Sequence, residues 1–555
     1  MAPKRKLDNG KSSSSKAQKK NGSNTESSSA LLSTDEMQNL VDEIIQSSKY
    51  NNLVPLLGQY EVIKTEIASK KNDKVETAGR RLSLSLFKAF QHLLKEGHLV
   101  AKKSYDDNRK LVVKWLINKY DSFKDIACDF IQTRFKYETS LQLDLLEIVL
   151  NLIRLESQYL KSGSNDLFFP NITYKKLCEA LLLSKSGEVL SDGSSDSFLV
   201  LEFIEKFAAN WDLQFYFINN LNEVLENWKK TKTDEELRSI FSKFFTIMKG
   251  PLLFTQEVDE LEKQQTWIQR KLPSIAYKQS QFKTQYQKAF LQILSYPLSV
   301  PQYKSILLIL HKRIIPNMAQ PQSIMDFLTD CYNISDDPVI PILALNSLYE
   351  LMRKYNLEYP DFYTKLYSLL TPELLYTRYR SRFFRLCDLF LTSTHLSANL
   401  VASFIKKLAR LSIGSSASGV VITIPFIYNL LKRHPTCMIM LHNTEASKDE
   451  DYVDPYNNDE VDPLKTDAIH SSLWEMETLM SHYHPNIATL AKIFGEPFRK
   501  HSYNMEDFLD WSYLTLLDSE KNRRYKTMAA LEYEEFDHLF EAKDEKKVYA
   551  EGWTL

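Results

Sequence analysis

The segment "SHYHPN", residues 481–486, places His482 and His484 two positions apart and directly before Pro485. Two imidazoles so close together could bind zinc, or act as acid and base in a metal-dependent hydrolase that also uses the acidic residues of 443–468. On a helix, however, residues two apart point about 200° away from each other. The five cysteines are far apart and form no CxxC pair, so we expect them to be reduced core residues rather than zinc ligands. We therefore expect no metal site, no catalytic site and no cofactor here.

A corner between two helices explains the same residues. Ile469, Leu473, Met476, Met480 and Tyr483 recur at steps of four and three, which predicts a helix over 467–484 with one buried stripe. Pro485 disfavours helical geometry at His484, and the imidazoles would bond free carbonyls at the end of the helix. Asn486 is the predicted N-cap of a second helix that buries Ile487, Leu490 and Phe494. Trp474 lies beside the first stripe, and we expect it in the core; anchoring a partner helix is the alternative.

Arginines form a second candidate site. In "YTRYRSRFFRLCDLF", Arg378, Arg382 and Arg385 share one predicted helix face, with Arg380 at its edge. The following segments add Lys406, Lys407, Arg410, Lys432 and Arg433. Guanidinium groups suit phosphate and carboxylate, so stacked helices could join these residues into one basic ridge that contacts RNA or a partner protein. The alternative, favoured for any single residue, is a solvated face paired to local Asp and Glu.

The elements that carry these residues are predicted to be helices. "LQLDLLEIVLNLIRLESQYL", residues 141–160, and "RLSLSLFKAFQHLL", residues 81–94, each repeat apolar residues at steps of three and four, and no long segment alternates with period two. Predicted helix pairs lie at 283–296 with 303–316, 322–332 with 339–355, 361–370 with 373–391, and 397–413 with 418–433. Units recurring about every 40 residues are typical of HEAT-like solenoids. We expect an all-α chain of helical-hairpin repeats.

The ends and interruptions of the chain divide it further. Residues 1–34 form a predicted disordered basic arm, because residues 1–30 hold seven basic residues, eight serines and almost nothing apolar. Its two basic clusters have the spacing of a nuclear import signal, and a solubilising or RNA-binding tail is the alternative. The import residues are Lys4, Arg5, Lys6, Lys19 and Lys20. The remaining regions are a helical region at 35–280, the HEAT-like repeats at 281–442, an acidic loop at 443–468 and a C-terminal helical region at 469–555.

A family resemblance rests on several of these motifs taken in order. "FIKKLARL", "NLLKRHP", the acidic loop with two Asp-Pro pairs, "SSLWE" and "HYHP" resemble the CCAAT-binding-factor and nucleolar-complex family over about residues 300–530. Trp474, His482, Tyr483, His484 and Pro485 belong to this pattern. The resemblance implies a nuclear and nucleolar scaffold without catalytic activity, part of the small-subunit processome, that serves 18S rRNA maturation, small-subunit assembly and export. It also implies nucleolar protein fourteen and other processome proteins as partners, with contact to pre-rRNA as a further possibility.

Composition is consistent with such a scaffold and leaves one other class of binding protein open. The net charge is -1, only 13 of 555 residues are glycine, and the most continuous apolar run, residues 420–431, is too short to span a membrane. We expect neither a membrane nor a small-molecule substrate as a partner. A helical-repeat nuclear transport adaptor is the alternative function, and the hydrolase that would use His482 and His484 is disfavoured.

Overall fold

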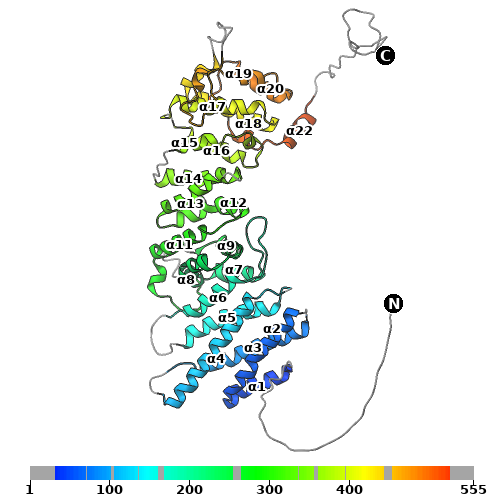
Figure 1. Ribbon diagram of the computed structural model, residues 1–555, viewed down its shortest axis with the longest axis vertical. Coiled ribbons are helices and arrows are strands. Elements are labelled where there is room, and N and C mark those ends of the chain that lie inside the picture. The colour runs from blue at the N-terminus through cyan, green and yellow to red at the C-terminus, as the bar shows by residue number, and fades with distance from the viewer. Residues whose placement is uncertain are drawn as a thin grey trace, which may run out of the picture. The chain divides into compact units, whose positions relative to one another are not determined.

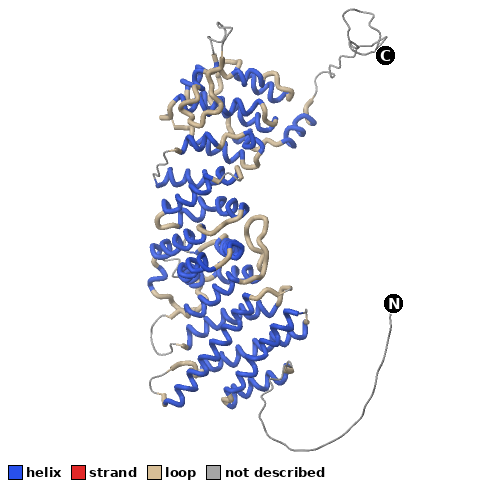
Figure 2. The backbone as a smooth tube through the Cα atoms, in the orientation of Figure 1, coloured by secondary structure: helices blue, strands red, loops and turns tan. Residues whose placement is uncertain are grey.

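The computed structural model describes residues 32–69, 72–101, 105–135, 137–160, 168–253, 264–334, 337–355, 361–393, 395–442 and 453–524. Over these ranges the protein is helical and has no strand, apart from an isolated bridge between Val189 and Ser195 (Figures 1 and 2). The all-α prediction is confirmed. The chain divides into two compact units, Met1–Phe327 and Leu328–Leu555. The predicted basic arm and its five import residues lie almost wholly outside the described ranges.

The first unit is a stack of helical hairpins in two layers. Helices α1, α3, α5, α7 and α9 contact one another in that order, and α2, α4, α6, α8 and α11 do the same in the second layer (Figure 1). Each helix therefore buries its apolar face against its hairpin partner and against its neighbours in the stack. The bounds are α1 (Thr34–Ser47), α2 (Leu53–Ser69), α3 (Asp73–Lys95), α4 (Asp107–Gln132), α5 (Ser140–Tyr159), α6 (Asn171–Leu183), α7 (Phe198–Ala209), α8 (Trp211–Thr231), α9 (Asp234–Met248), α11 (Gln279–Leu294) and α12 (Val300–Ile309).

Local sequence signals set these helices. A capping box formed by Ser33 and Glu36 begins α1, and the side chain of Asn72 caps α3. The predicted stripe of α5 is buried, including Leu141, Leu145 and Leu152. In α3, Gly79 lets the neighbouring helix approach, because a Cβ atom there would lie 2.9 Å from Leu141 Cδ2. Periodicity, caps and one small residue thus account for this part of the stack.

The second unit is built around two long helices, α17 (Ala398–Ile413) and α18 (Ala417–Arg433), which pack against each other. Residues 417–431 of α18 are all buried, as expected for the apolar run at 420–431. The predicted helix pairs from 283 to 433 have counterparts in the structure, except that the segment 373–391 is not one helix. The other helices are α13 (Met325–Asn333), which spans the division between the units, α14 (Val339–Tyr355), α15 (Phe362–Ser368), α16 (Arg380–Phe390), α19 (Trp474–Leu479), α20 (Pro485–Ala491), α21 (Glu506–Leu509) and α22 (Tyr513–Lys521).

The structure corrects the prediction of one helix over 373–391. A 3-10 helix over Pro372–Tyr376 comes first, Thr377 is extended with φ -72° and ψ 150°, and α16 begins only at Arg380. Arg378 therefore precedes the helix and cannot share a helix face with Arg382 and Arg385. The apolar residues Phe383, Leu386 and Phe390 of α16 are buried.

The predicted helix over 467–484 is also wrong. A 3-10 turn over Ala468–His470 ends at an extended Ser471, and α19 spans only Trp474–Leu479. The backbone N–H of Leu473 donates to the Met440 carbonyl at 2.9 Å, a tertiary bond that replaces continuous helix. Leu473 and Met476 are buried, but Tyr483 is 80% exposed. The apolar periodicity of 467–484 therefore corresponds to α-helix only over Trp474–Leu479.

Candidate functional site: the Lys406 charge cluster and the Arg378 pocket

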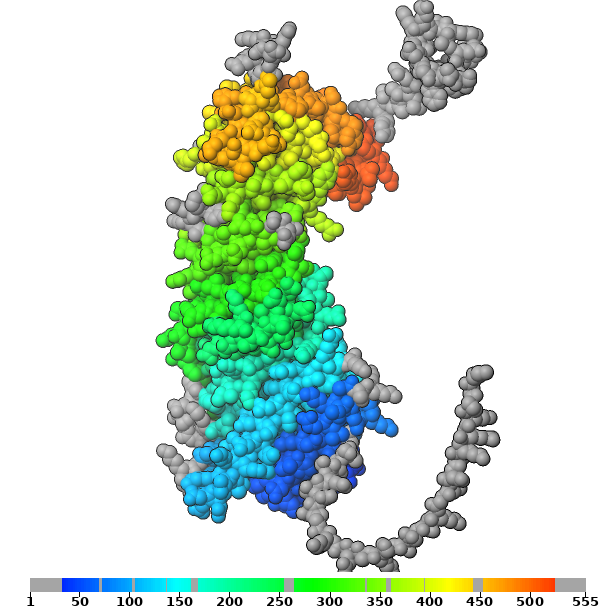
Figure 3. All heavy atoms as spheres, in the orientation of Figure 1, coloured from blue at the N-terminus to red at the C-terminus, as the bar shows by residue number. Residues whose placement is uncertain are grey.

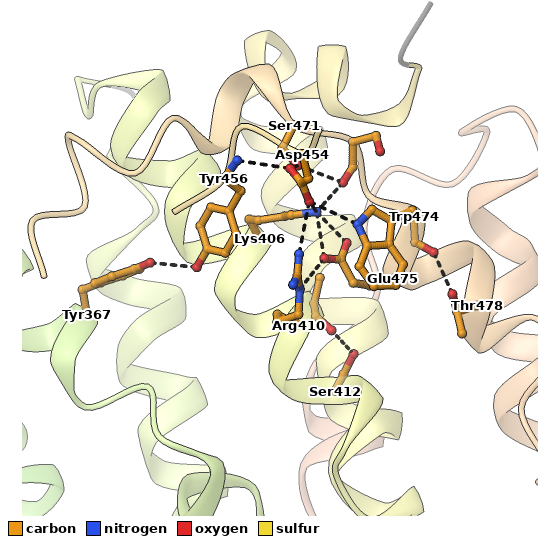
Figure 4. A network of polar contacts seen from close by, with 12 residues as sticks. Tyr367, Lys406, Arg410, Ser412, Asp454, Tyr456, Ser471, Trp474, Glu475 and Thr478 are labelled. Carbon is orange, nitrogen blue, oxygen red and sulfur yellow. Dashed lines mark hydrogen bonds and ion pairs between the residues drawn. The ribbon is translucent and has the colours of Figure 1, made fainter. Parts of the chain in front are cut away.

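Four charged side chains meet where α17 is covered by residues 453–475, the covering segment, which begins within the acidic loop. Lys406 and Arg410 lie one turn apart on α17, Glu475 is in the first turn of α19, and Asp454 lies in the acidic loop before Glu475. We call Lys406, Arg410, Asp454 and Glu475 the charge cluster (Figure 4). Its formal charges balance, with two cations and two anions.

Lys406 is the centre of the charge cluster. Its Nζ lies 2.7 Å from Glu475 Oε1 and 2.9 Å from Oε2, and it donates to the Ser472 carbonyl at 2.6 Å (Figure 4). The side chains of Lys406 and Glu475 are both 0% exposed. Burying such a pair costs desolvation that only close geometry and further hydrogen bonds offset, and this ammonium has both. The expectation that Lys406 contributes to an accessible basic ridge is therefore wrong.

Arg410 lies on the solvent side of the charge cluster. Its Nε donates to Glu475 Oε1 at 2.9 Å and its Nη2 to Asp454 Oδ2 at 3.1 Å. The guanidinium carbon lies 4.9 Å from the centre of the Trp474 ring, a cation–π contact. Trp474 Nε1 in turn donates to Asp454 Oδ2 at 3.3 Å, and the residue is 40% exposed. Trp474 thus partly covers the charge cluster and is not a core residue.

Asp454 ties the covering segment to α17. Burial raises the pKa of its carboxyl, but hydrogen bonds from the Ser471 hydroxyl and the Tyr456 N–H, together with the Lys406 charge, hold that pKa below its ordinary value. Farther along, Ser403 Oγ of α17 contacts the hydroxyl of Thr466, and Tyr456 meets Tyr367 at 3.0 Å between the hydroxyl oxygens. The part of the acidic loop from residue 453 onward is consequently packed on α17, with Tyr456 and Thr466 buried.

Most other predicted basic residues also have partners within the second unit. Arg385 binds Glu506 with Nε at 2.8 Å from Oε1, and Arg433 binds both carboxylate oxygens of Asp388, at 2.6 and 3.1 Å. The Lys407 ammonium lies 4.0 Å from the centre of the Tyr367 ring, and burial lowers its pKa. These three residues contact side chains of other helices, and their partners are distant in sequence rather than the local Asp and Glu of a solvated face. A continuous basic ridge does not form.

Arg378 is the exception, because it is exposed at the edge of a pocket. The Arg378 pocket, about 380 Å³, is lined by residues that include Arg378, Arg380, Ser416 and Tyr513. Arg380 is held in its wall, where its Nη1 donates to the Leu375 carbonyl at 2.9 Å and to Ser418 Oγ at 3.2 Å, and burial lowers its pKa. Arg382 and Lys432 also lack a carboxylate partner among the described residues, but both are only partly exposed and the Nη1 of Arg382 is buried, so Arg378 is the one of the three that is open to an anionic group.

The two histidines accept hydrogen bonds from the backbone at the corner. His482 Nδ1 accepts from the N–H of His484 at 3.0 Å, and His484 Nδ1 accepts from the N–H of Asn486 at 3.3 Å. His484, not Asn486, is the N-cap of α20, and the imidazoles bond N–H groups rather than carbonyls. In the second helix Ile487 is buried, whereas Leu490 and Phe494 are only partly so. In the part of the chain that the structure describes, no three His, Cys, Asp or Glu residues could together hold a metal ion.

Comparison with known proteins adds what geometry alone does not. Residues 341–491, which contain the whole charge cluster, the corner and part of the lining of the Arg378 pocket, match the CBF/Mak21 family. Residues 25–232 match the TPR repeats of nucleolar complex protein 4-like proteins. Nucleolar complex protein 4 of Saccharomyces cerevisiae is 44% identical over 522 residues, covering 89% of this chain and 93% of the relative. The chain belongs to the nucleolar complex protein 4 family. Nucleolar complex protein 4 homolog B of Xenopus laevis is 32% identical over 89% of the chain, and the Mus musculus homolog 29% over 76%.

Membership of the nucleolar complex protein 4 family places the protein in the nucleus and nucleolus, in ribosome biogenesis. The family consists of helical-repeat proteins and is not a known class of enzyme. None of the described helices is long and apolar enough to cross a membrane. The family motifs "FIKKLARL" and "SSLWE" now have a physical meaning, because they supply Lys406, Arg410 and Glu475 to the charge cluster.

Sequence reasoning missed the acidic half of the charge cluster. Glu475 stands between Trp474 and Met476, next to the apolar Leu473, and a carboxylate among these apolar neighbours was the signal that a buried cation lay opposite. Asp454 carried no such signal, because the acidic loop contains nine acidic residues and only the tertiary fold selects one of them.

Proposed function

We propose that the protein is a non-catalytic scaffold of the small-subunit processome, where it binds nucleolar protein fourteen and supports 18S rRNA maturation and the assembly and export of the small subunit. The observation that carries this proposal is the match to nucleolar complex protein 4 of Saccharomyces cerevisiae over 89% of this chain and 93% of that protein. A match of that extent covers both units, so it concerns the whole protein rather than a shared repeat.

The side chains of the second unit support a scaffold. The charge cluster has its ions paired with one another, with no unpaired nucleophile or base directed at a cavity. Stacked helical hairpins expose long surfaces that suit protein and RNA partners. Within the second unit, Arg378 is the predicted contact residue best placed to meet an acidic segment of the partner or a pre-rRNA phosphate.

Rapid depletion of the protein, followed by analysis of pre-rRNA, tests this function. We expect precursors of 18S rRNA to accumulate while precursors of the large-subunit rRNAs mature at their normal rate. Re-expression of the wild-type chain should restore 18S rRNA. A chain without residues 453–492, which lacks Asp454 and Glu475, is the negative control and should not restore it. Loss of large-subunit rRNA with normal 18S rRNA would refute the small-subunit assignment.

A further inference from the structure

A groove with an apolar wall lies in the first unit, where α4 faces the turn between α1 and α2. The turn is a 3-10 helix, η1 (Tyr50–Asn52). The groove has a volume of about 650 Å³, and its lining includes Lys49, Tyr50, Asn51, Leu111, Val112 and Trp115. Figure 3 shows the surface of the first helices, in dark blue, beside that of α4 in lighter blue. No part of this groove belongs to the charge cluster or the Arg378 pocket.

The apolar side chains of the groove are exposed because α4 is longer than α2 and α6, the helices on either side of it in the stack. Helix α4 has 26 residues, whereas α2 has 17 and α6 has 13. Within its first turns Val113 is buried, but Leu111 is 67% exposed and Val112 is 44% exposed. A cluster of Leu, Val and Trp side chains on a formed concave surface is typical of a protein interaction site, whereas single exposed apolar residues are ordinary.

Two lysines without carboxylate partners lie on α4 beside this wall. Lys119 Nζ lies 5.7 Å from the centre of the Trp115 ring, and Lys114 is exposed on the same helix. Neither lysine has a carboxylate partner among the residues that the structure describes. The neighbouring cations are paired, Lys49 with Glu43 at 3.4 Å and Lys110 with Asp107 at 2.9 Å. Two uncompensated positive charges therefore lie on α4 beside the apolar wall, outside the lining of the groove itself.

We propose that this groove binds an acidic peptide segment of a partner protein. Aliphatic or aromatic side chains of the segment would pack against Leu111, Val112 and Trp115, while its carboxylates pair with Lys114 and Lys119. RNA fits less well, because the lining contains no arginine and its most exposed apolar side chains, Leu111 and Val112, are aliphatic and give bases no surface for stacking. The inference does not depend on the small-subunit role, since it rests on the first unit alone.

Site-specific photo-crosslinking in the full-length protein tests the groove. A photoreactive amino acid in place of Asn51 reports on its occupant, and the same group in place of Asn227, an exposed residue of α8, is the matched control. We expect the first position to crosslink to a protein whose attached peptide has a net negative charge and apolar side chains. Adding Leu111→Asp and Val112→Asp should lower that yield about tenfold or more, as loss of a central apolar contact does.

Further variants separate the apolar from the electrostatic contribution. Lys114→Glu with Lys119→Glu should lower the yield several-fold, and raised salt should lower the wild-type yield in the same direction. Leu201→Asp, at a 50% exposed residue of α7, should change nothing. Circular dichroism and thermal unfolding of each variant exclude a folding defect. Crosslinks to RNA, to a basic peptide, or to a second copy or another segment of this chain would overturn the proposal. A yield equal to that at Asn227, or unchanged by the Asp variants, would do the same.

Discussion

At the scale of single residues, the structure separates basic side chains that build the protein from those that can bind a partner. Lys406 is enclosed with Glu475, whereas Arg378 is exposed at a pocket edge. We predict that Lys406→Met lowers the free energy of unfolding by about 3 to 5 kcal/mol, because it leaves a buried carboxylate short of a partner. Arg378→Ala, the matched control, should change it by less than about 0.5 kcal/mol. Urea unfolding of both variants measures this difference, and equal stability of the two would contradict the burial of the charge cluster.

Asp454 gives the charge cluster a dependence on pH. Its pKa is lowered in the folded protein, so the folded state holds fewer protons than the unfolded state as the solution is acidified. The stabilisation is fully present above about pH 4, the ordinary aspartate value, and is lost as the pH falls through the lower folded value. We predict that Asp454→Asn is less stable than wild type at pH 7 and that the gap narrows toward pH 3. A gap that is constant across this range in urea titrations would show that the carboxylate charge is not responsible.

The sequence predicted basic residues on helices but not their partners. Lys406 and Lys407 are adjacent in sequence and equally basic, yet one is enclosed by carboxylates and the other lies over a tyrosine ring. The difference arises because residues 453–475 fold back over α17, although they begin about 40 residues after that helix ends. Periodicity describes one helix at a time and contains no information about which segment covers it.

At the scale of elements, helices were predicted well where their own periodicity decides the structure. The stripes of α3 and α5 and the buried run of α18 lie where the sequence placed them. Predictions failed at Thr377 and at Ser471, where an apolar pattern continues but the backbone turns extended. At the second of these, the Leu473 N–H bonds the Met440 carbonyl, a tertiary contact that no local propensity reveals.

Packing between neighbouring hairpins can be tested at two glycines. At Gly79 of α3 a Cβ atom would lie 2.9 Å from Leu141, whereas at Gly58 of α2 nothing lies within 4 Å. Gly79→Leu should therefore force α3 and α5 apart and lower the free energy of unfolding by about 1 to 3 kcal/mol. Gly58→Ala should raise it by about 1 kcal/mol, since alanine favours the helix. Thermal and urea unfolding measure both changes, and a neutral Gly79→Leu variant would mean that the two helices are not in contact at this residue.

At the scale of the whole molecule, we predict that nuclear import depends on the two basic clusters of the N-terminal arm, which lie outside the described ranges. Lys4, Arg5, Lys6, Lys19 and Lys20 form the two predicted clusters, and we expect their joint replacement by Ala to leave a fluorescent fusion largely cytoplasmic. The reason is that a carrier reads separated basic clusters on an extended chain. Replacement of Lys11 and Lys16, which lie between the clusters, is the control and should have little effect. Full nuclear signal after the five substitutions would assign import to another segment or to a bound partner.

We expect the protein to assemble with a dedicated partner in small-subunit biogenesis. The most direct measurement is the composition of complexes purified through a tag on the full chain, from nuclear extract treated with RNase. We predict that nucleolar protein fourteen is recovered in close to equimolar amount and that RNase does not release it, because contacts between proteins outlast removal of the RNA. Recovery of large-subunit assembly proteins alone, or of no stoichiometric partner after RNase, would contradict the account.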